Sequence, residues 1–153
     1  MSSRLFQTVR ERNGLCYSVY SFPSSYIDTG MFSIYVGLGQ EQERKAAHLI
    51  CDVLREFCEE GPTREELSRC REQLKSNLLM GLESTNARMH HLGRSELFQQ
   101  RVVDADELVA AYDAVTAEQI CQLARQVFRF DKASICAVGN TGSQEYYQEL
   151  IAI

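Results

Sequence analysis

Two short stretches near the start of the chain alternate between apolar and polar residues, as half-buried β-strands do. The alternation runs through 15–22 and again through 31–38, and a period of two predicts two strands that pair as neighbours. Because 23–30 contains no two-residue turn signal, we expect a long loop between them rather than a tight hairpin. The predicted shared faces are Leu15, Tyr17 and Val19 on the first strand, and Phe32, Ile34, Val36 and Leu38 on the second.

Most of the remaining chain repeats its apolar residues at helical spacing. The stretch 40–60 predicts a helix that ends at Gly61-Pro62. Further helix starts are predicted where a capping residue precedes a glutamate or glutamine by three positions, or where a polar break occurs. These starts are Thr63 with Glu66, the break at 84–86, Asp104 with Glu107, and Thr116 with Gln119. The inward residues are expected to be Ala46, Leu49, Ile50, Val53, Leu54 and Phe57 in the first helix, and Ile120, Leu123, Ala124, Val127 and Phe128 in the last.

A third strand is predicted at 132–138, closed by Gly139-Asn140. Together these elements predict an α+β fold, with an antiparallel or mixed sheet packed against several helices. We find no linker, low-complexity tract or repeat, so residues 1–153 are expected to form a single partial domain.

Composition narrows the class of protein. The 153 residues are 44% hydrophobic, enough for one sizeable core, and no apolar run reaches the length of a membrane span. A net charge of −5 without a basic stripe excludes a nucleic-acid surface. The six cysteines are scattered without a C-x-x-C motif, which indicates reduced core residues and a cytoplasmic protein.

The richest chemistry lies in the stretch 2–22. It places Arg10 on a short amphipathic helix and Tyr17 on the strand that follows, with Asn13-Gly14 as the break between them. A guanidinium and a phenol are both hydrogen-bond donors, suited to holding a peptide carbonyl and a developing oxyanion. Arg12 is the competing arginine and ranks second, while Tyr20 and Tyr26 are interpreted as packing or loop residues.

The three histidines do not predict a metal site. His90 and His91 are adjacent, and no carboxylate follows at the spacing of a zinc peptidase motif. His48 lies three residues before Cys51 with no third ligand at a suitable spacing. All three are interpreted as ordinary helix residues.

The run around Arg10 and Tyr17 closely resembles the second-half signature of the pitrilysin family of zinc metallopeptidases, which includes insulin-degrading enzyme and the mitochondrial processing peptidase. The likeness continues in order through 84–89, 92–96 and 113–118. In this family an arginine and a tyrosine at this spacing lie in the C-terminal, non-zinc-binding half, facing the zinc site. The resemblance therefore implies that Arg10 and Tyr17 are catalytic and substrate-binding residues of a zinc metalloendopeptidase.

The same resemblance implies that zinc, its ligands and the glutamate base lie in the other half, a zinc-binding N-terminal half or partner subunit, and that this chain needs no cofactor. It also implies that the chain begins inside a domain, because the family has earlier strands there. We therefore expect a peptide substrate, no activity in the isolated chain, and self-association through an exposed sheet edge. The alternative is a catalytically silent scaffold or partner subunit of the same family.

Overall fold

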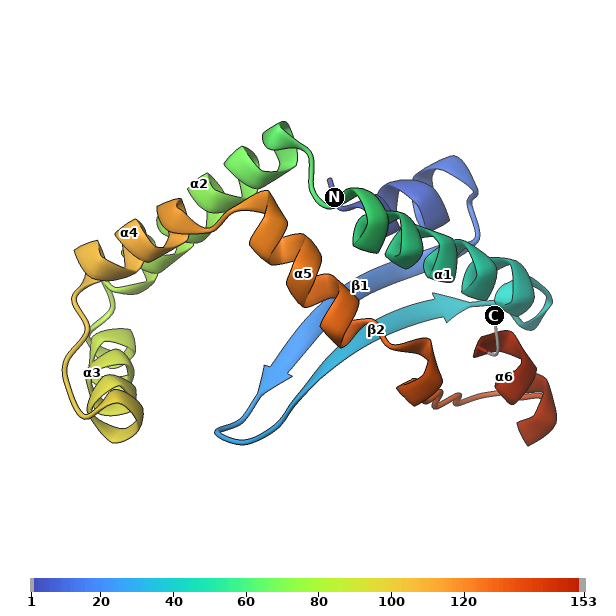
Figure 1. Ribbon diagram of the computed structural model, residues 1–153. Helices are drawn as coiled ribbons and strands as arrows, with labels where there is room; N and C mark the ends of the chain where they lie inside the picture. Colours follow the sequence, from blue (N-terminus) through green and yellow to red (C-terminus); the bar gives the residue numbers. More distant parts are fainter. Residues whose placement is uncertain (1, 152–153) are drawn as a thin grey trace. The chain divides into compact units, whose positions relative to one another are not determined.

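The computed structural model describes residues 2–151, which fall into two compact units (Figure 1). Unit 1 is Met1–Glu60 with Cys121–Ile153, and unit 2 is Gly61–Ile120. Unit 1 contains η1 (Phe6–Arg12), β1 (Cys16–Ser25), β2 (Gly30–Leu38), η2 (Gln40–Gln42), α1 (Glu43–Glu60), η3 (Phe130–Lys132) and α6 (Gln144–Ile151). Unit 2 contains α2 (Arg64–Gly81), α3 (Thr85–Gln99) and α4 (Ala105–Ala114). Helix α5 (Ala117–Val127) begins at the end of unit 2 and continues in unit 1.

Strands β1 and β2 form a two-stranded antiparallel sheet, with Val19 opposite Val36 and Ser21 opposite Ile34. Both predicted strands are therefore present, and the predicted α+β class is confirmed. Each strand pairs with the other alone among the described residues, so each keeps one edge whose backbone groups have no strand partner there.

The connection between the strands is shorter than predicted. Pairing extends to Ser25 and Gly30, and the backbone N–H of Tyr26 donates to the carbonyl of Thr29 at 2.9 Å. The expected long loop at 23–30 is therefore wrong, and the two strands form a hairpin with a four-residue connection. The missing two-residue turn signal excluded only the tightest hairpin, and Pro23 lies within β1 opposite Phe32, as a proline can in a strand at a sheet edge.

The two faces of the sheet carry different side chains. One face packs on helices: Val19 joins a cluster with Val9 and Leu5 from the N-terminal segment and with Ala46 and Val53 from α1. On the opposite face Tyr20 stacks on Tyr35 with ring centroids 4.9 Å apart, and Phe22 lies 6.0 Å from Tyr20. This second face stays open to solvent, with Tyr20 52% and Tyr35 49% exposed.

Helix α1 follows the predicted amphipathic pattern. Ala46 and Val53 are buried, and Leu49 and Ile50 pack against the same cluster. The predicted start at Gln40 is a short 3-10 turn, η2, that leads directly into α1. The hydrophobic stripe thus places α1 on the inner face of the sheet.

The C-terminal part departs from two predictions. Residues 133–138 form neither helix nor strand, so the predicted third strand is wrong; isolated alternation cannot make a strand without a neighbour to pair with. In α5, Ala124 is buried as predicted, but Leu123 and Val127 are 59% and 44% exposed. Phe128 does pack inward, with its ring 4.9 Å from that of Phe32.

In unit 2 the helix starts follow local capping chemistry. Thr63 accepts from the backbone N–H of Glu66 at 3.2 Å, and the Glu66 carboxylate accepts from the Thr63 N–H at 2.8 Å, a complete capping box. Ser84 caps α3 as predicted. The predicted box at Asp104 and Glu107 does not form, because the Glu107 carboxylate binds the Arg101 guanidinium instead, with one contact at 2.8 Å.

A second complete box begins α5. The Thr116 hydroxyl accepts from the Gln119 N–H at 3.2 Å, and the Gln119 carboxamide accepts from the Thr116 N–H at 2.8 Å. All four predicted helix starts are thus present, with Asp104 at the N-cap of α4 although its side chain makes no cap bond. Within the part of the chain that the structure describes, no helix has the length and apolar character needed to cross a bilayer.

Candidate functional site

The candidate site is the corner where η1 turns into β1. Helix η1 has π-helical geometry, a rare widened form that occurs mostly as short pieces and is frequent at functional sites. The corner is fixed by Gly14, whose φ of +59° lies in the left-handed region that favours glycine. Two backbone bonds close it, from the Gly14 N–H to the Arg10 carbonyl at 2.8 Å and from the Leu15 N–H to the Val9 carbonyl at 3.1 Å.

The Asn13 side chain adds a third connection at this corner. Its amide donates to the Thr8 carbonyl at 2.8 Å, which satisfies an acceptor at the end of the helix. Val9, on the inner side of the same helix, is completely buried in the core. The helix that carries Arg10 is therefore anchored by both its cap and its packing.

A β-bulge then sets the direction of Tyr17. Cys16 lies opposite Leu38 and Ser18 opposite Gly37, so Tyr17 is an extra residue without a partner of its own on β2. The bulge shifts the alternation by one residue, and Tyr17 is 82% exposed whereas Val19 is 6% exposed. The prediction that Tyr17 shares the face of Val19 is therefore wrong. Bulges commonly re-aim a side chain next to a functional site.

The structure brings Arg10 and Tyr17 together. The Arg10 guanidinium carbon lies 5.2 Å from the centre of the Tyr17 ring and 4.9 Å from the Phe6 ring, both cation–π contacts. Its Nε is also 3.8 Å from the Glu11 carboxylate. The Arg10 side chain is 35% exposed, because two aromatic rings cover part of it.

Arg10 also acts on the thiol beneath the corner. Burial raises the pKa of Cys16, and the positive charge of Arg10 opposes part of that rise. The guanidinium charge thus reaches the first residue of β1. Arg12, the competing arginine, is exposed on the same helix, and it is Arg10 that the structure records against Tyr17.

Phe6 is a further residue of the site, one that was not predicted from the sequence. It lies four residues before Arg10, and residues at this spacing share a helix face, so the i, i+4 pattern would have revealed the contact. Tyr20 packs on Tyr35 and Tyr26 lies in the hairpin connection, in line with their predicted roles as packing and loop residues.

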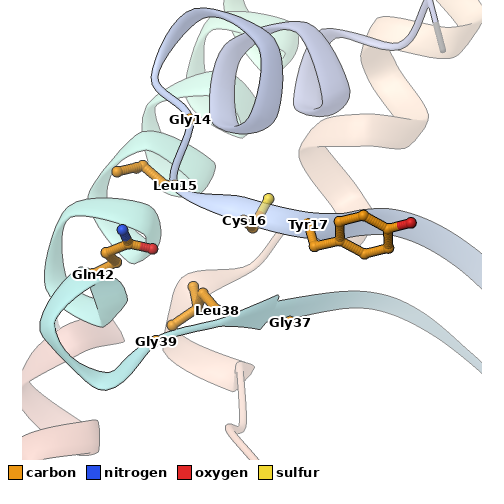
Figure 2. A pocket seen from close by; sticks show the side chains of 8 residues that line it. All are labelled: Gly14, Leu15, Cys16, Tyr17, Gly37, Leu38, Gly39 and Gln42. Carbon is orange, nitrogen blue, oxygen red and sulfur yellow. The ribbon is translucent and has the colours of Figure 1, made fainter.

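A shallow hollow adjoins the corner at the ends of the two strands. Figure 2 shows Leu15, Leu38 and Gln42 around it, with the Tyr17 ring at its border and turned outward. Gly14, Gly37 and Gly39 also line it, so backbone is accessible there. The corner therefore offers a cation, a phenol and exposed backbone within a small area.

The three histidines lie on two helices, His48 on α1 and His90 and His91 on α3. His48 is exposed on α1, whereas Cys51, its proposed neighbour, is buried. His91 lies in unit 2 with its Nε2 2.8 Å from the Val103 carbonyl. Among residues 2–151 no group of three histidine, cysteine, aspartate or glutamate side chains is arranged to hold a metal ion.

Comparison with known proteins shows which proteins this chain is similar to. Residues 1–74 match the sequence model described as the peptidase M16 inactive domain. An uncharacterized zinc protease of Bacillus subtilis, YmxG, is 44% identical over 133 residues, which is 87% of this chain and 32% of that protein. An uncharacterized zinc protease of Streptomyces coelicolor is 39% identical over 127 residues, 83% of this chain and 28% of the relative. The chain thus spans about a third of the length of these relatives.

Solved structures agree. The peptidase M16 inactive domain from Pseudomonas fluorescens matches with a TM-score of 0.73 and 26% identity, over 85% of this chain and 31% of the other. A conserved protein from Enterococcus faecalis V583 matches with a TM-score of 0.72 and 25% identity, over 81% of this chain and 29% of that one. The predicted resemblance to the zinc metallopeptidases, and to their half without the zinc, is confirmed.

Proposed function

This chain is similar to the peptidase M16 inactive domain, and we propose that it is the part of a zinc-dependent peptidase that closes over the active site and helps to bind the peptide. The names of its relatives support a peptidase parent, and the name of the matched domain supports the non-zinc-binding half. The other half would supply the zinc, an activated water and a glutamate base. The part of this chain would be binding and charge stabilisation, through the Arg10 guanidinium and the Tyr17 phenol.

The observation that carries the proposal is the contact between Arg10 and Tyr17. The bulge turns the phenol outward, and the capped helix holds the guanidinium 5.2 Å from its ring. Two donors held in advance lose little freedom when a carbonyl binds, and they stabilise negative charge as it develops. Arg10 and Tyr17 would therefore position the scissile carbonyl and stabilise its tetrahedral oxyanion.

The sheet supports an extended peptide as the substrate. Each of β1 and β2 keeps an edge without a strand partner among the described residues, and such edges accept an added strand. A peptide or presequence-like segment bound in this way would run beside the corner that carries Tyr17. The same free edges support self-association of the isolated chain, for which a dimer is the expected form.

We further propose that both compact units belong to a single partial domain of one cytoplasmic parent. The 133-residue match to the Bacillus subtilis relative is longer than either unit alone, which supports one continuous segment. The partner would be the zinc-binding half, on the same chain or on another subunit.

The test is steady-state kinetics on the parent protein with a fluorogenic peptide, alongside thermal unfolding. Tyr17→Phe keeps the ring that Arg10 contacts and removes only the hydroxyl, so kcat should fall about 10²-fold with an unchanged Tm. Arg10→Lys keeps a charge and loses the planar fork, and should lower kcat by a similar order. Arg12→Ala and Tyr26→Phe are the matched controls, exposed residues of the same two types, and should leave kcat unchanged.

Near-normal turnover in Tyr17→Phe and Arg10→Lys, or a loss that follows unfolding, would return both residues to a structural role. A parent without chelator-sensitive hydrolysis would favour the alternative of a silent scaffold or partner subunit. The isolated chain is expected to neither retain zinc after reconstitution nor cleave peptides. One tightly held zinc per chain would contradict the proposed division between halves.

A further inference from the structure

Cys58 and Cys121 lie where the chain leaves unit 1 and where it returns. Unit 1 ends its first segment at Glu60, two residues after Cys58, and resumes at Cys121. Both cysteines belong to unit 1, one near the end of α1 and the other within α5. Although they are 63 positions apart, the Cys121 thiol donates to the Cys58 carbonyl with Sγ and O 3.0 Å apart.

A second bond holds the two helices at this point. The Arg125 Nε donates to the same Cys58 carbonyl at 2.8 Å. This carbonyl is near the end of α1, where carbonyl groups lack partners within their own helix, and α5 supplies two donors for it. The two cysteines are therefore held as neighbours by contacts that do not require a covalent bond.

From this juxtaposition we propose that Cys58 and Cys121 form a reversible disulfide that closes residues 59–120 into a loop. Disulfides join residues whose Cα atoms are about 4.4–6.8 Å apart, and the Cys121 Sγ already lies 3.0 Å from the backbone carbonyl of Cys58. The oxidant would be a small disulfide such as oxidised glutathione. One cysteine thiolate attacks it and releases one reduced thiol; the second cysteine then loses its proton, attacks the mixed disulfide and releases the other.

The surroundings of the pair indicate a slow and selective reaction. Burial raises the pKa of Cys58, and the neighbouring Cys121 thiol raises it further, while the Arg125 guanidinium opposes the rise. Cys58 and Cys121 are half-buried. Their exposure is intermediate, since Cys16 and Cys51 are buried and Cys70 and Cys136 are exposed. The exposed cysteines would react with the small disulfide first, whereas Cys58 and Cys121 have each other as the resolving partner.

The bond would act on the loop rather than on the candidate site. It would join the two points at which the chain leaves and re-enters unit 1, and it would restrict the unfolded chain. Redox state would therefore control how readily the end of α1 and the start of α5 separate within unit 1. No residue of the proposed catalytic corner takes part, so this inference stands or fails independently of the proposed function.

The experiment uses the full 153-residue chain, incubated with oxidised glutathione and then with cysteamine at low concentration to remove exposed mixed disulfides. Thiol titration should fall from six to four per chain, and peptide mapping without reduction should find the Cys58 and Cys121 peptides joined. The Tm should rise by roughly 4 °C or more over the reduced chain, as expected for closure of a long loop. Cys58→Ala and Cys121→Ala should abolish the joined peptide and the rise, whereas Cys70→Ser and Cys136→Ser should keep both.

A map on the wild-type chain decides the matter even if a variant fails to fold. Glutathione on Cys58 and Cys121 separately, a bond between either of them and another cysteine, or bonds only between two chains would overturn the proposal. A joined pair without any rise in Tm would overturn the claim that the bond restrains the loop.

Discussion

The two compact units hold their helices together in different ways. Unit 1 has a contiguous apolar cluster, with Val9 completely buried and Leu5, Val19 and Ala46 around it. In unit 2, among the described residues, Val103 is the one buried large hydrophobic side chain, and many apolar residues lie exposed. They include Leu74, Leu79, Met80, Met89, Leu92, Leu97, Phe98 and Val102.

Unit 2 has polar contacts between α2 and the end of α4. The Arg71 guanidinium donates to the Val115 carbonyl, and Lys75 contacts Asp113 at 2.9 Å and, within α2 itself, Glu72 at 2.7 Å. Such contacts fix geometry but add little net stability when exposed. Unit 1 therefore has a hydrophobic core of its own, whereas unit 2 exposes apolar faces of the kind that other protein surfaces usually cover.

Among the tests of this comparison, the largest loss of stability is expected from a substitution in the core of unit 1. Val9→Ala removes two methyl groups from a side chain with no solvent exposure, and should lower the free energy of unfolding by about 2 kcal/mol. Leu97→Ala in α3 is the counterpart in unit 2; at 75% exposure it should change little. Urea unfolding followed by circular dichroism is the measurement, since the chain has no tryptophan. Equal losses in both variants would break the distinction between the units.

A smaller loss is expected at the corner of the candidate site. Gly14→Ala places a Cβ on a residue with φ of +59° but with no atom within 4 Å, so its cost is backbone strain alone, about 1–2 kcal/mol. Gly39→Ala is the control, because it also meets open space and has an extended backbone. Differential scanning calorimetry on both should show a lower Tm only for Gly14→Ala. An unchanged Tm there would mean that the corner relaxes and does not hold Arg10 rigidly.

In unit 2 the strongest local signal is the capping box of α2. Thr63→Ala removes the hydroxyl that caps Glu66 and should cost about 1 kcal/mol. Asp104→Ala is matched to it, since Asp104 occupies the same cap position on α4 without making a side-chain cap bond, and should cost less. Hydrogen exchange at the first turns of α2 and α4 measures each helix separately. A greater loss at Asp104 would show that its charge near the helix end matters more than the hydrogen bond.

The smallest effect concerns exposed ion pairs. The side-chain hydrogen bond from Arg101 holds the pKa of Glu107 below its ordinary value, and Arg129 does the same for Asp131 in unit 1. Because the folded pKa is depressed, any stabilisation is complete above the unfolded pKa and is lost as pH falls through the folded pKa. Arg101→Gln and Arg129→Gln should return these carboxyl pKa values toward normal in carbon-detected NMR titrations. Neither variant should shift the unfolding midpoint at neutral pH; a clear shift in Arg101→Gln alone would show that unit 2 depends on its polar contacts.

Sequence alone predicted the features that depend on neighbours along the chain. The boxes at Thr63 and Thr116 and the stripe of α1 are set within a few residues, and the structure has them. The predicted capping box at Asp104 does not form, because Arg101 competes for the Glu107 carboxylate. The spacing of Asp104 and Glu107 alone does not reveal this competing ion pair. The predicted strand at 132–138 failed because a strand needs a partner from elsewhere in the chain.

The candidate site shows the same division. Arg10 and Tyr17 were predicted by residue type and by resemblance, but alternation put Tyr17 on the face of Val19. One extra residue at the bulge turns the Tyr17 side chain to the other face of the strand. The neighbouring residues in the sequence do not indicate where a bulge will occur. The contact between the two side chains therefore needed the structure.

The discontinuous course of unit 1 has a consequence for its synthesis on the ribosome. Met1–Glu60 emerges first, but the rest of its unit begins only at Cys121. At about 5–20 residues per second, the intervening segment takes roughly 3–12 s to translate. During that interval α5 has not yet been synthesised, so the nascent hairpin and α1 lack it. The Phe32 ring then has no Phe128 ring to pack against. Completion of this unit is thus timed by the length of the segment inserted in it.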